Sequence, residues 1–392
     1  MPIRPAVRAF IIAAFICALT AGARAAEGPA AVVGVEPAQD RELSGEWEGQ
    51  IHRETRANFG FGPINYAIRQ TYRYHKDDPG RVEVGEGYIG MPAPCSCNWY
   101  HGGFLAIVLN GRDIGTTPLS SMTVAENSGG RAIMDMVWRD EAADVRARFV
   151  GLPGRDYLIC EITLDPVAEI TSVGLKLRCY PSFFTSWHKR DGARRVQTPA
   201  SLVEQGSTET LPADENWWAV YYDEIFDVER GEGEGPCALL LPPGQATEIR
   251  LAPGGYSVET AIDFPADTRR IRMAVWDYHG RTNADALASM RAGADAVRRE
   301  LEQADFTPEA LTTFDVALAR EEVQWALGSA PARELLGDTA DEIEAWLADY
   351  APALEAATGG AGVRAQEDLL TAVSAYNDFR WQIRLSRLLV EE

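Results

Sequence analysis

The chain has 392 residues, enough for two domains or for one large sandwich with an appendage. Its hydrophobic content of 46% is ordinary for a protein that forms a sizeable core. The formal net charge is −21, so the surface repels nucleic acid phosphates and anionic membranes, and neither is expected as a partner.

The first 25 residues predict a secretory signal peptide. A positively charged start precedes a short apolar run, and Ala23-Arg24-Ala25 matches the small-x-small cleavage rule. Cleavage there leaves a chain that begins at Ala26, and no later apolar run is long enough for a membrane helix. We therefore expect a periplasmic or secreted protein with no membrane insertion after signal cleavage.

Residues 26–40 contain small residues, glycine and proline without periodicity, which predicts a flexible lead-in. The clearest strand lies at 64–75, where large apolar side chains alternate with polar ones, and this predicts one buried face and one solvent face. The aromatic run at 216–228 has large apolar side chains on both faces and predicts an interior strand. Further strands are expected at 43–52, 81–89, 103–110, 132–139, 143–151, 157–164, 173–180, 237–241, 247–251, 256–262 and 270–276. Residues 180–215 are expected to be irregular.

Many short strands with turn residues between them predict an antiparallel β-sandwich over residues 41–281. An enlarged, supersandwich-like version, of the kind that carbohydrate-active proteins use, is a fold-level analogy. A three-four spacing of apolar residues begins at 283 and predicts helices near 283–301, 307–328, 338–350 and 363–392. The expected fold class is thus mainly β, with a C-terminal α-helical bundle over residues 283–392.

Five cysteines remain after the signal peptide, so at least one is expected to be unpaired. Cys95, Cys97 and His101 supply soft ligands for Zn²⁺ or Cu⁺, although a fourth ligand is not evident. The stronger interpretation is a structural disulfide in an exported chain, and no metal or other cofactor is predicted. That disulfide would join Cys95 or Cys97 to Cys160, Cys179 or Cys237.

Three aromatic–histidine clusters are candidates for ligand binding, because exposed rings stack on the apolar faces of sugars while neighbouring polar groups bond the hydroxyls. The alternative is that each Trp fills the edge of the core and each His caps it. Convergence of the three clusters on one cleft would favour sugar binding. The clusters are Trp99-Tyr100-His101, Trp187-His188 and Trp276-Asp277-Tyr278-His279.

Asp223 and Glu224 end the aromatic run and are weak candidates for a general acid and base. Neighbours on a strand point to opposite faces, so the alternative is that they mark the exposed end of the strand. A catalytic role would require a cleft in which His101, His188 or His279 meets a carboxylate, such as Asp277, or an arginine. The sequence has no nucleotide-binding glycine fingerprint and no zinc-protease or lipase motif, so it leaves open whether the protein is an enzyme.

These features predict an exported carbohydrate-binding or carbohydrate-processing accessory protein that uses aromatic clusters on a β-sandwich. The candidate ligand-binding residues are Trp99, Tyr100, Trp187, Trp276 and Tyr278. The alternative is a non-catalytic structural or interaction protein of the envelope. It would hold a protein partner through the final helix, which carries a second apolar face at Leu385, Leu388 and Leu389.

Overall fold

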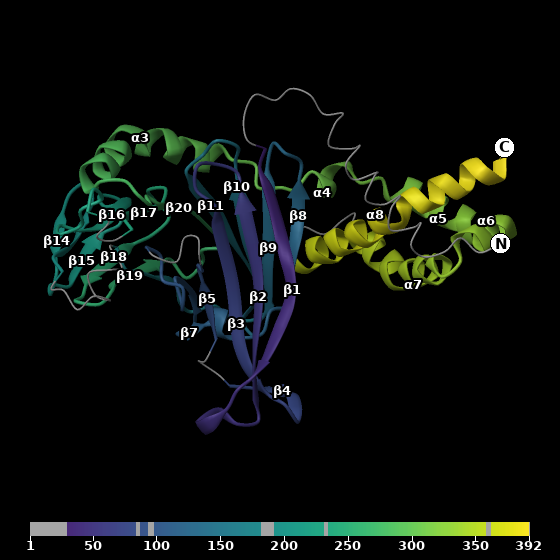
Figure 1. Cartoon of the computed structure of the whole chain (residues 1–392), viewed down its shortest axis with the longest axis horizontal. Helices are drawn as coiled ribbons and strands as arrows, with labels where there is room; N and C mark the ends of the chain where they lie inside the picture. The colour runs from purple at the N-terminus through teal and green to yellow at the C-terminus, as the bar shows by residue number, and fades with distance from the viewer. Residues whose placement is uncertain are drawn as a thin grey trace.

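A computed structural model describes residues 30–83, 87–92, 98–181, 192–230, 234–357 and 362–391. Over these residues two antiparallel β-sheets come first in the chain, and α-helices follow them (Figure 1). The predicted fold class is confirmed: the protein is mainly β with a C-terminal helical segment.

The first sheet, here called the front sheet, contains eleven of the described strands. Nine follow the order β1-β2-β3-β5-β6-β12-β19-β18-β15, while β4 pairs with β3 and β7 pairs with β6. The bounds are β1 Val32–Glu42, β2 Gln50–Gly60, β3 Tyr66–His75, β4 Asp78–Val82, β5 Tyr88–Gly90, β6 Leu105–Leu109, β7 Arg112–Asp113, β12 Val173–Cys179, β15 Glu209–Pro212, β18 Glu248–Pro253 and β19 Val258–Phe264.

The second sheet, here called the back sheet, contains nine described strands in the order β14-β13-β16-β17-β20-β11-β10-β9-β8. Short 3-10 turns at Gly45–Trp47 and Ile114–Thr116 belong to loops of the sandwich. The bounds are β8 Ser121–Asn127, β9 Ala132–Arg139, β10 Ala143–Gly151, β11 Tyr157–Pro166, β13 Arg194–Gln197, β14 Leu202–Glu204, β16 Trp218–Asp223, β17 Cys237–Leu240 and β20 Arg270–Asp277.

The alternation of side chains sets which face of each strand is buried. In β3, Tyr66 and Ile68 are buried in the core, whereas Arg69 and Arg73 point out of the sandwich, as the pattern at 64–75 predicts. Every residue of β16 is buried, which confirms that the aromatic run is an interior strand. One cluster of buried apolar side chains from both sheets fills the space between them.

The two outer faces of the sandwich differ. Helix α3, Asn283–Gln303, places Ala286, Met290 and Ala294 against Trp218 and Trp276 on the outer face of the back sheet. The main helix–strand contacts of the described residues are likewise made with back-sheet strands. The outer face of the front sheet is therefore the side of the sandwich that remains available to solvent along its middle strands.

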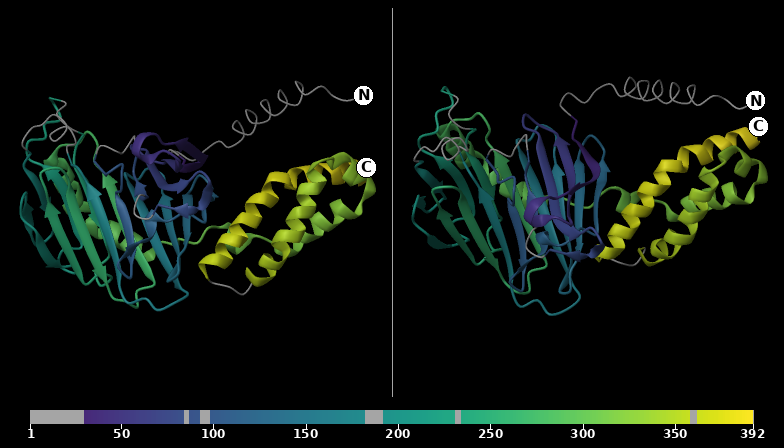
Figure 2. Two further views of the ribbon diagram at one scale, coloured as in Figure 1. Left: turned by 90° about the horizontal axis from the view of Figure 1, so that it is seen from below. Right: turned by 60° about the horizontal axis from the view of Figure 1, so that its bottom comes forward.

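The remaining helices form a bundle beside the sandwich, and α8 contacts β10 and β11 of the back sheet (Figures 1 and 2). The core of the bundle contains Val323, Ile343, Trp346, Tyr376 and Ile383. None of the described helices combines the length and the apolar character that crossing a membrane requires. The bounds are α4 Ala310–Thr313, α5 Val316–Gly328, α6 Ala330–Leu336, α7 Thr339–Ala357 and α8 Val363–Glu391.

Several expectations about regular structure differ from the fold. Strand β1 begins at Val32, inside the expected lead-in at 26–40, because an edge strand that is mostly exposed needs few apolar residues. Strands β13, β14 and β15 lie within the stretch expected to be irregular, and each is too short to give a clear alternation. The helix expected at 307–328 is two helices, because the Asp315 side chain accepts a hydrogen bond from Leu318 N (2.9 Å) and starts α5.

Candidate ligand-binding trough

Three adjoining hollows cross the outer face of the front sheet, and together we call them the trough. Hollow A (about 380 Å³) and hollow B (about 390 Å³) adjoin at Gly102 and Gly103, while hollow C (about 210 Å³) shares Lys176 and Arg250 with hollow B. Hollow A is lined by Arg41, Leu43, Trp47, His52, Arg73, Gly87, Tyr88 and Gly102. Hollow B is lined by Gly103, Ala106, Lys176, Leu177, Arg178, Thr208, Arg250, Ala252, Glu259, Thr260 and Ala261.

The polar lining of the trough follows from the same alternation that builds the core. In β12, Lys176 and Arg178 face the trough, whereas their neighbours Leu175 and Leu177 are buried between the sheets. In β18, Arg250 alternates with buried neighbours in the same way. The strands therefore stabilise the sandwich with one face and present cationic side chains with the other.

A cluster of four rings lies where hollows A and B adjoin. The Tyr100 and Tyr180 rings are 4.9 Å apart between centroids, Tyr180 and Tyr256 are 5.3 Å apart, and Tyr100 and His101 are 5.2 Å apart. The Arg178 guanidinium lies 4.5 Å from the centroid of Tyr100 and 5.8 Å from that of Tyr256. Tyr180 is buried beneath the cluster, and Tyr256 is 52% exposed, so the cluster presents an aromatic surface to solvent.

Arginines and rings also alternate at the hollow A end. Arg73 lies 5.0 Å from the centroid of Trp47, whose side chain is 43% exposed. Arg69 lies 5.3 Å from the centroid of Tyr88 and donates through Nη2 to the backbone oxygen of His101 (2.9 Å). The guanidinium of Arg69 thus connects hollow A to the ring cluster.

The environment shifts the pKa of His52, His101 and Tyr100 toward the uncharged form. Burial, followed by the charge of Arg69, lowers the pKa of His101, and burial with Arg41 has the same effect on the pKa of His52. Burial, followed by a hydrogen bond with Tyr256, raises the pKa of Tyr100. These groups therefore offer neutral hydrogen-bond donors and acceptors to a ligand.

Of the residues predicted to bind a ligand, Tyr100 lies beside Arg178 and Gly102 at the junction of hollows A and B, although neither Tyr100 nor His101 lines a hollow. Trp99 points the opposite way, is fully buried, and donates from Nε1 to the backbone oxygen of Trp276 (2.7 Å). The Trp276 ring packs near Tyr278 beneath α3. These described clusters therefore do not converge on one cleft, and Trp99, Trp276 and Tyr278 belong to the interior.

The weak catalytic candidates are also dispersed. Asp223 is buried, contrary to the expectation of an exposed strand end, and its carboxylate accepts from Ala193 N (2.9 Å). Glu224 is exposed and pairs with Arg195 (2.8 Å), so the two carboxylates differ in environment. His279 pairs with Glu234 (3.1 Å) away from the trough. Trp187, His188, Cys95 and Cys97 lie outside the described residues.

Asp277 has the most perturbed environment of these candidates. It is fully buried, and burial raises the pKa of its carboxyl to about 8. Its Oδ1 accepts a hydrogen bond from Asn98 Nδ2 (2.6 Å), while Oδ2 has no hydrogen-bond partner among the described residues. The group is therefore mostly protonated at neutral pH, but it is enclosed beneath residues 98–100 and does not line the trough.

The structure does not contain the disulfide that was predicted to reach Cys160, Cys179 or Cys237. All three of these cysteines are buried and free. Burial raises the pKa of the Cys160 and Cys237 thiols, which keeps both protonated. Within the described ranges, no group of three or more His, Cys, Asp or Glu side chains is placed to hold a metal ion.

Sequence reasoning missed most of the trough. Arg69 and Arg73 were correctly expected on a solvent face, but their partners come from strands far away in the sequence. Tyr256 begins the strand expected at 256–262, but only the pairing of β12 with β19 brings it beside Tyr100. Strand order, which the sequence pattern does not specify, was the missing information.

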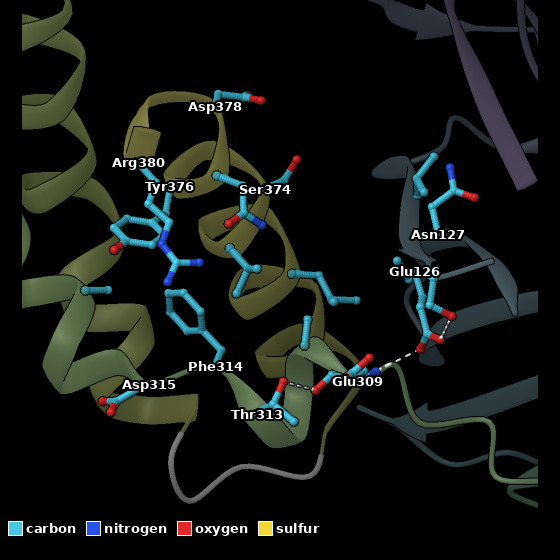
Figure 3. Close-up of a pocket in the computed structure, with 18 of the residues that line it drawn as sticks. Glu126, Asn127, Glu309, Thr313, Phe314, Asp315, Ser374, Tyr376, Asp378 and Arg380 are labelled. Carbon is cyan, nitrogen blue, oxygen red and sulfur yellow. Dashed lines mark hydrogen bonds between the residues drawn. The ribbon is translucent and has the colours of Figure 1, made fainter. Parts of the chain in front are cut away.

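A larger hollow of about 620 Å³ lies elsewhere, between β8 and helices α4, α5 and α8 (Figure 3). Figure 3 shows Phe314 and Tyr376 on its helical side, and the backbone N of Glu309 donates to Glu126 (2.9 Å) across it. Glu126 is also paired with Arg131 (2.7 Å). The predicted ligand-binding residues that the structure describes do not line this hollow, which marks the boundary between sandwich and bundle.

No protein-family model matches the chain, and no curated protein sequence matches it. Solved structures do match. One is the GH36 α-galactosidase AgaA from Geobacillus stearothermophilus, with 8% identity and a TM-score of 0.33 over 56% of this chain and 40% of that one. Another is a putative aldose 1-epimerase from Klebsiella pneumoniae, with 11% identity and a TM-score of 0.36 over 66% of this chain and 96% of that one. A putative aldose 1-epimerase from Escherichia coli matches at 8% identity and a TM-score of 0.30.

The names of these proteins describe carbohydrate-processing enzymes. This chain spans less than half the length of the α-galactosidase. At such low identities and TM-scores these matches assign no activity to this chain.

Proposed function

We propose that the protein is an exported carbohydrate-binding or accessory protein that holds a saccharide in the trough. The observation that carries this proposal is a row of solvent-facing rings on the outer face of the front sheet, with arginines between them. The rings are Trp47, Tyr88 and Tyr256. Ring faces pack on the apolar C–H faces of sugars, and neighbouring polar groups satisfy the hydroxyls. The neutral imidazoles of His52 and His101 suit that second role.

Binding is a better fit to the trough than catalysis. Glycoside hydrolysis uses a carboxylic acid with a raised pKa that faces the substrate. Burial raises the pKa of Asp277 to about 8 and that of Asp113 to about 6, yet neither side chain lines the trough. The raised pKa of Tyr100 likewise argues against a role as a proton-abstracting base.

Removing a trough ring is expected to weaken saccharide binding. Tyr256→Ala and Tyr88→Ala should each weaken retention about threefold to tenfold, because an aromatic contact of this kind contributes roughly 0.5–1.5 kcal/mol. The measurement is affinity gel electrophoresis against a panel of neutral and acidic polysaccharides, with melting temperatures recorded for each variant.

Trp381→Ala is the matched control, because Trp381 is 61% exposed but lies on α8 in the bundle. This variant should be retained like the parent protein. Parent protein that no polysaccharide of the panel retards, or equal retention of the Tyr256→Ala and parent proteins, would contradict the proposal.

The export part of the proposal rests on the signal-like first 25 residues. Protein recovered from the periplasm or the medium of the native host should begin at Ala26 when its N-terminus is sequenced. Recovery only from the cytoplasm, with the first 25 residues retained, would argue against export.

A second candidate function is protein interaction through the final helix. Leu385 and Leu388 near the end of α8 are exposed, Leu388 by 63%, and they lie on one side of the helix with Trp381. The electrophoresis experiment separates the two functions, because Leu388→Ser should leave saccharide retention unchanged. Cross-linking in the native host that yields only monomer would weaken this second candidate.

A further inference from the structure

We infer that Cys179 and Cys237 are an oxidisable thiol pair, which forms a disulfide between the two sheets when the exported protein folds in an oxidising compartment. Because the bond needs such a compartment, this inference rests on the export part of the proposed function and is independent of its ligand-binding part. The structure describes both residues as free thiols, which is the reduced form of the pair.

The two cysteines lie at strand ends on opposite sheets. Cys179 is the last residue of β12 in the front sheet, and Cys237 is the first residue of β17 in the back sheet. Cys179 shares its face of β12 with the core residue Leu177, and Cys237 shares its face of β17 with the core residue Leu239. Both side chains are fully buried, so each thiol points from its own sheet into the space between the sheets.

Their contacts make the two residues neighbours across that space. A hydrogen bond joins the Cys237 thiol to the side chain of Cys179. One backbone oxygen also connects the two sites: Asn98 O accepts a hydrogen bond from Tyr180 N (2.8 Å), directly after Cys179, and lies 3.9 Å from Cys237 Sγ. A disulfide forms only between side chains that already adjoin, and this pair meets that condition.

Other inter-sheet contacts hold the sheets together around the thiols. Tyr221, the cross-strand neighbour of Cys237, places its hydroxyl 2.9 Å from Thr260 Oγ1 on the front sheet. Trp99, which is bridged to Cys179, donates from Nε1 to the backbone oxygen of Trp276 on the back sheet (2.7 Å). A covalent bond between the sulfurs would therefore form where the sheets are already tied to each other.

The third buried thiol is placed differently. Cys160 lies on β11, opposite Phe149 of β10 and Met273 of β20. Strand β20 separates β11 from β17, so Cys160 and Cys237 lie two strand spacings apart, roughly 9–10 Å. That separation is beyond the Cα range of a disulfide, and Cys160 therefore serves as a matched control within the same core.

The chemistry is thiol–disulfide exchange with an oxidant of the disulfide class, either a thiol–disulfide oxidoreductase or a low-molecular-weight disulfide. The thiolate of one cysteine attacks the oxidant, forms a mixed disulfide and releases one thiol. The second cysteine then attacks that mixed disulfide, which forms the Sγ–Sγ bond and releases the second thiol. The protein thus loses two electrons and two protons, and the oxidant gains them.

The timing of the reaction follows from burial. In the folded protein, burial and then the hydrogen bond with Cys179 raise the pKa of the Cys237 thiol, and only the thiolate is a nucleophile. The bond should therefore form while the chain folds, before the sheets close over the thiols. Once formed, it closes the chain from β12 to β17 into a loop, which restricts the unfolded state.

The test is oxidative refolding of the full chain. Protein unfolded in reductant is refolded with oxidised glutathione, and a parallel sample is refolded with the reductant still present. Free thiols are then alkylated and the protein is digested without reduction. Trypsin cuts after Lys176, Arg178 and Arg230, so Cys160, Cys179 and Cys237 fall in three different peptides. We expect one linked peptide that joins Cys179 to Cys237 and separates on reduction.

Melting temperatures give a second measurement. The oxidised protein should melt roughly 5–15 °C above the reduced protein, because the bond removes conformational freedom from the unfolded chain. Cys179→Ala and Cys237→Ala should each abolish both the linked peptide and this difference. Cys160→Ala removes a thiol from the same core and should keep both.

Several outcomes would overturn the inference. One is that Cys179 and Cys237 are both alkylated after oxidative refolding. Another is that either of them is linked mainly to Cys95, Cys97 or Cys160. Equal melting temperatures of the oxidised and reduced proteins would overturn it as well.

Failure of the proposed function would look different. A Cys179–Cys237 peptide after refolding supports the thiol pair even where the native host retains the protein in its cytoplasm, a result that contradicts export alone. Absence of saccharide retention contradicts only the ligand-binding part, because neither thiol lines the trough.

Discussion

Asp135→Ala is expected to destabilise the sandwich by about 3–5 kcal/mol, because it leaves the Arg148 guanidinium buried without its counterion. Asp135 and Arg148 are cross-strand neighbours on β9 and β10, and their side chains are 3% and 2% exposed. Two hydrogen bonds join them, from Arg148 Nε to Oδ1 (2.7 Å) and from Nη2 to Oδ2 (2.6 Å). Urea denaturation followed by a signal of the sandwich would measure the loss.

Two comparisons show whether burial causes this effect. The double variant Asp135→Leu with Arg148→Met should recover most of the lost stability, because it removes both charges from the interior. Glu344→Ala breaks an exposed pair with Arg333 (2.9 Å) and should cost at most about 1 kcal/mol. A loss of similar size for Asp135→Ala and Glu344→Ala would refute the explanation.

Asp277→Asn is expected to raise the melting temperature near pH 8 and to give a smaller gain toward pH 4. Burial raises the pKa of Asp277 to about 8 in the folded protein, whereas an unfolded Asp titrates near 3.9. The folded state therefore holds a proton that the unfolded state releases. The stability from this proton is fully present below pH 3.9 and is lost as the pH rises to about 8.

The size of this effect follows from the pKa difference. Each unit corresponds to about 1.4 kcal/mol, so the parent protein should lose roughly 3–6 kcal/mol between pH 4 and pH 8 through this group. The Asn variant has no such titration and keeps an amide that can bond Asn98. Thermal denaturation at several pH values would measure the difference, with Asp267→Asn, at an exposed carboxylate, as the control. A parent-minus-variant difference that is constant with pH would contradict the assignment.

The sequence pattern predicts the strands in which each side chain is either clearly buried or clearly exposed. Strands β9 and β10 match their expected bounds, because every residue in them except Arg139 is buried and apolar residues dominate both strands. On β3 the pattern also places Tyr66 and Ile68 in the core and Arg69 and Arg73 on the outer face, although Ala67 and Thr71 on that outer face are buried as well. Strand β8 was missed because it lies at a sheet edge, where half-buried positions accept polar residues such as Thr123 and Glu126.

The candidate site was predicted only in part, and the reason is physical. The aromatic clusters predict ligand-binding residues at both tryptophans and tyrosines, yet Trp99, Trp276 and Tyr278 are buried in the interior. The trough depends on arginines and tyrosines that adjoin only once β3, β12 and β19 are placed in order in one sheet. Hydrophobic periodicity reports burial along one strand and contains no information about which strands become neighbours.

The opposite orientations of Trp99 and Tyr100 also have a mechanical consequence. Tyr100 faces the trough, while the preceding residue is tied by Trp99 Nε1 to the backbone of the opposite sheet, and Tyr100 N donates to Arg178 O (3.1 Å). The aromatic surface is therefore preorganised by the rigidity of the whole sandwich. When a ligand docks on this surface, the protein loses little conformational entropy, and no loop needs to close at these residues. Affinity therefore depends on surface complementarity.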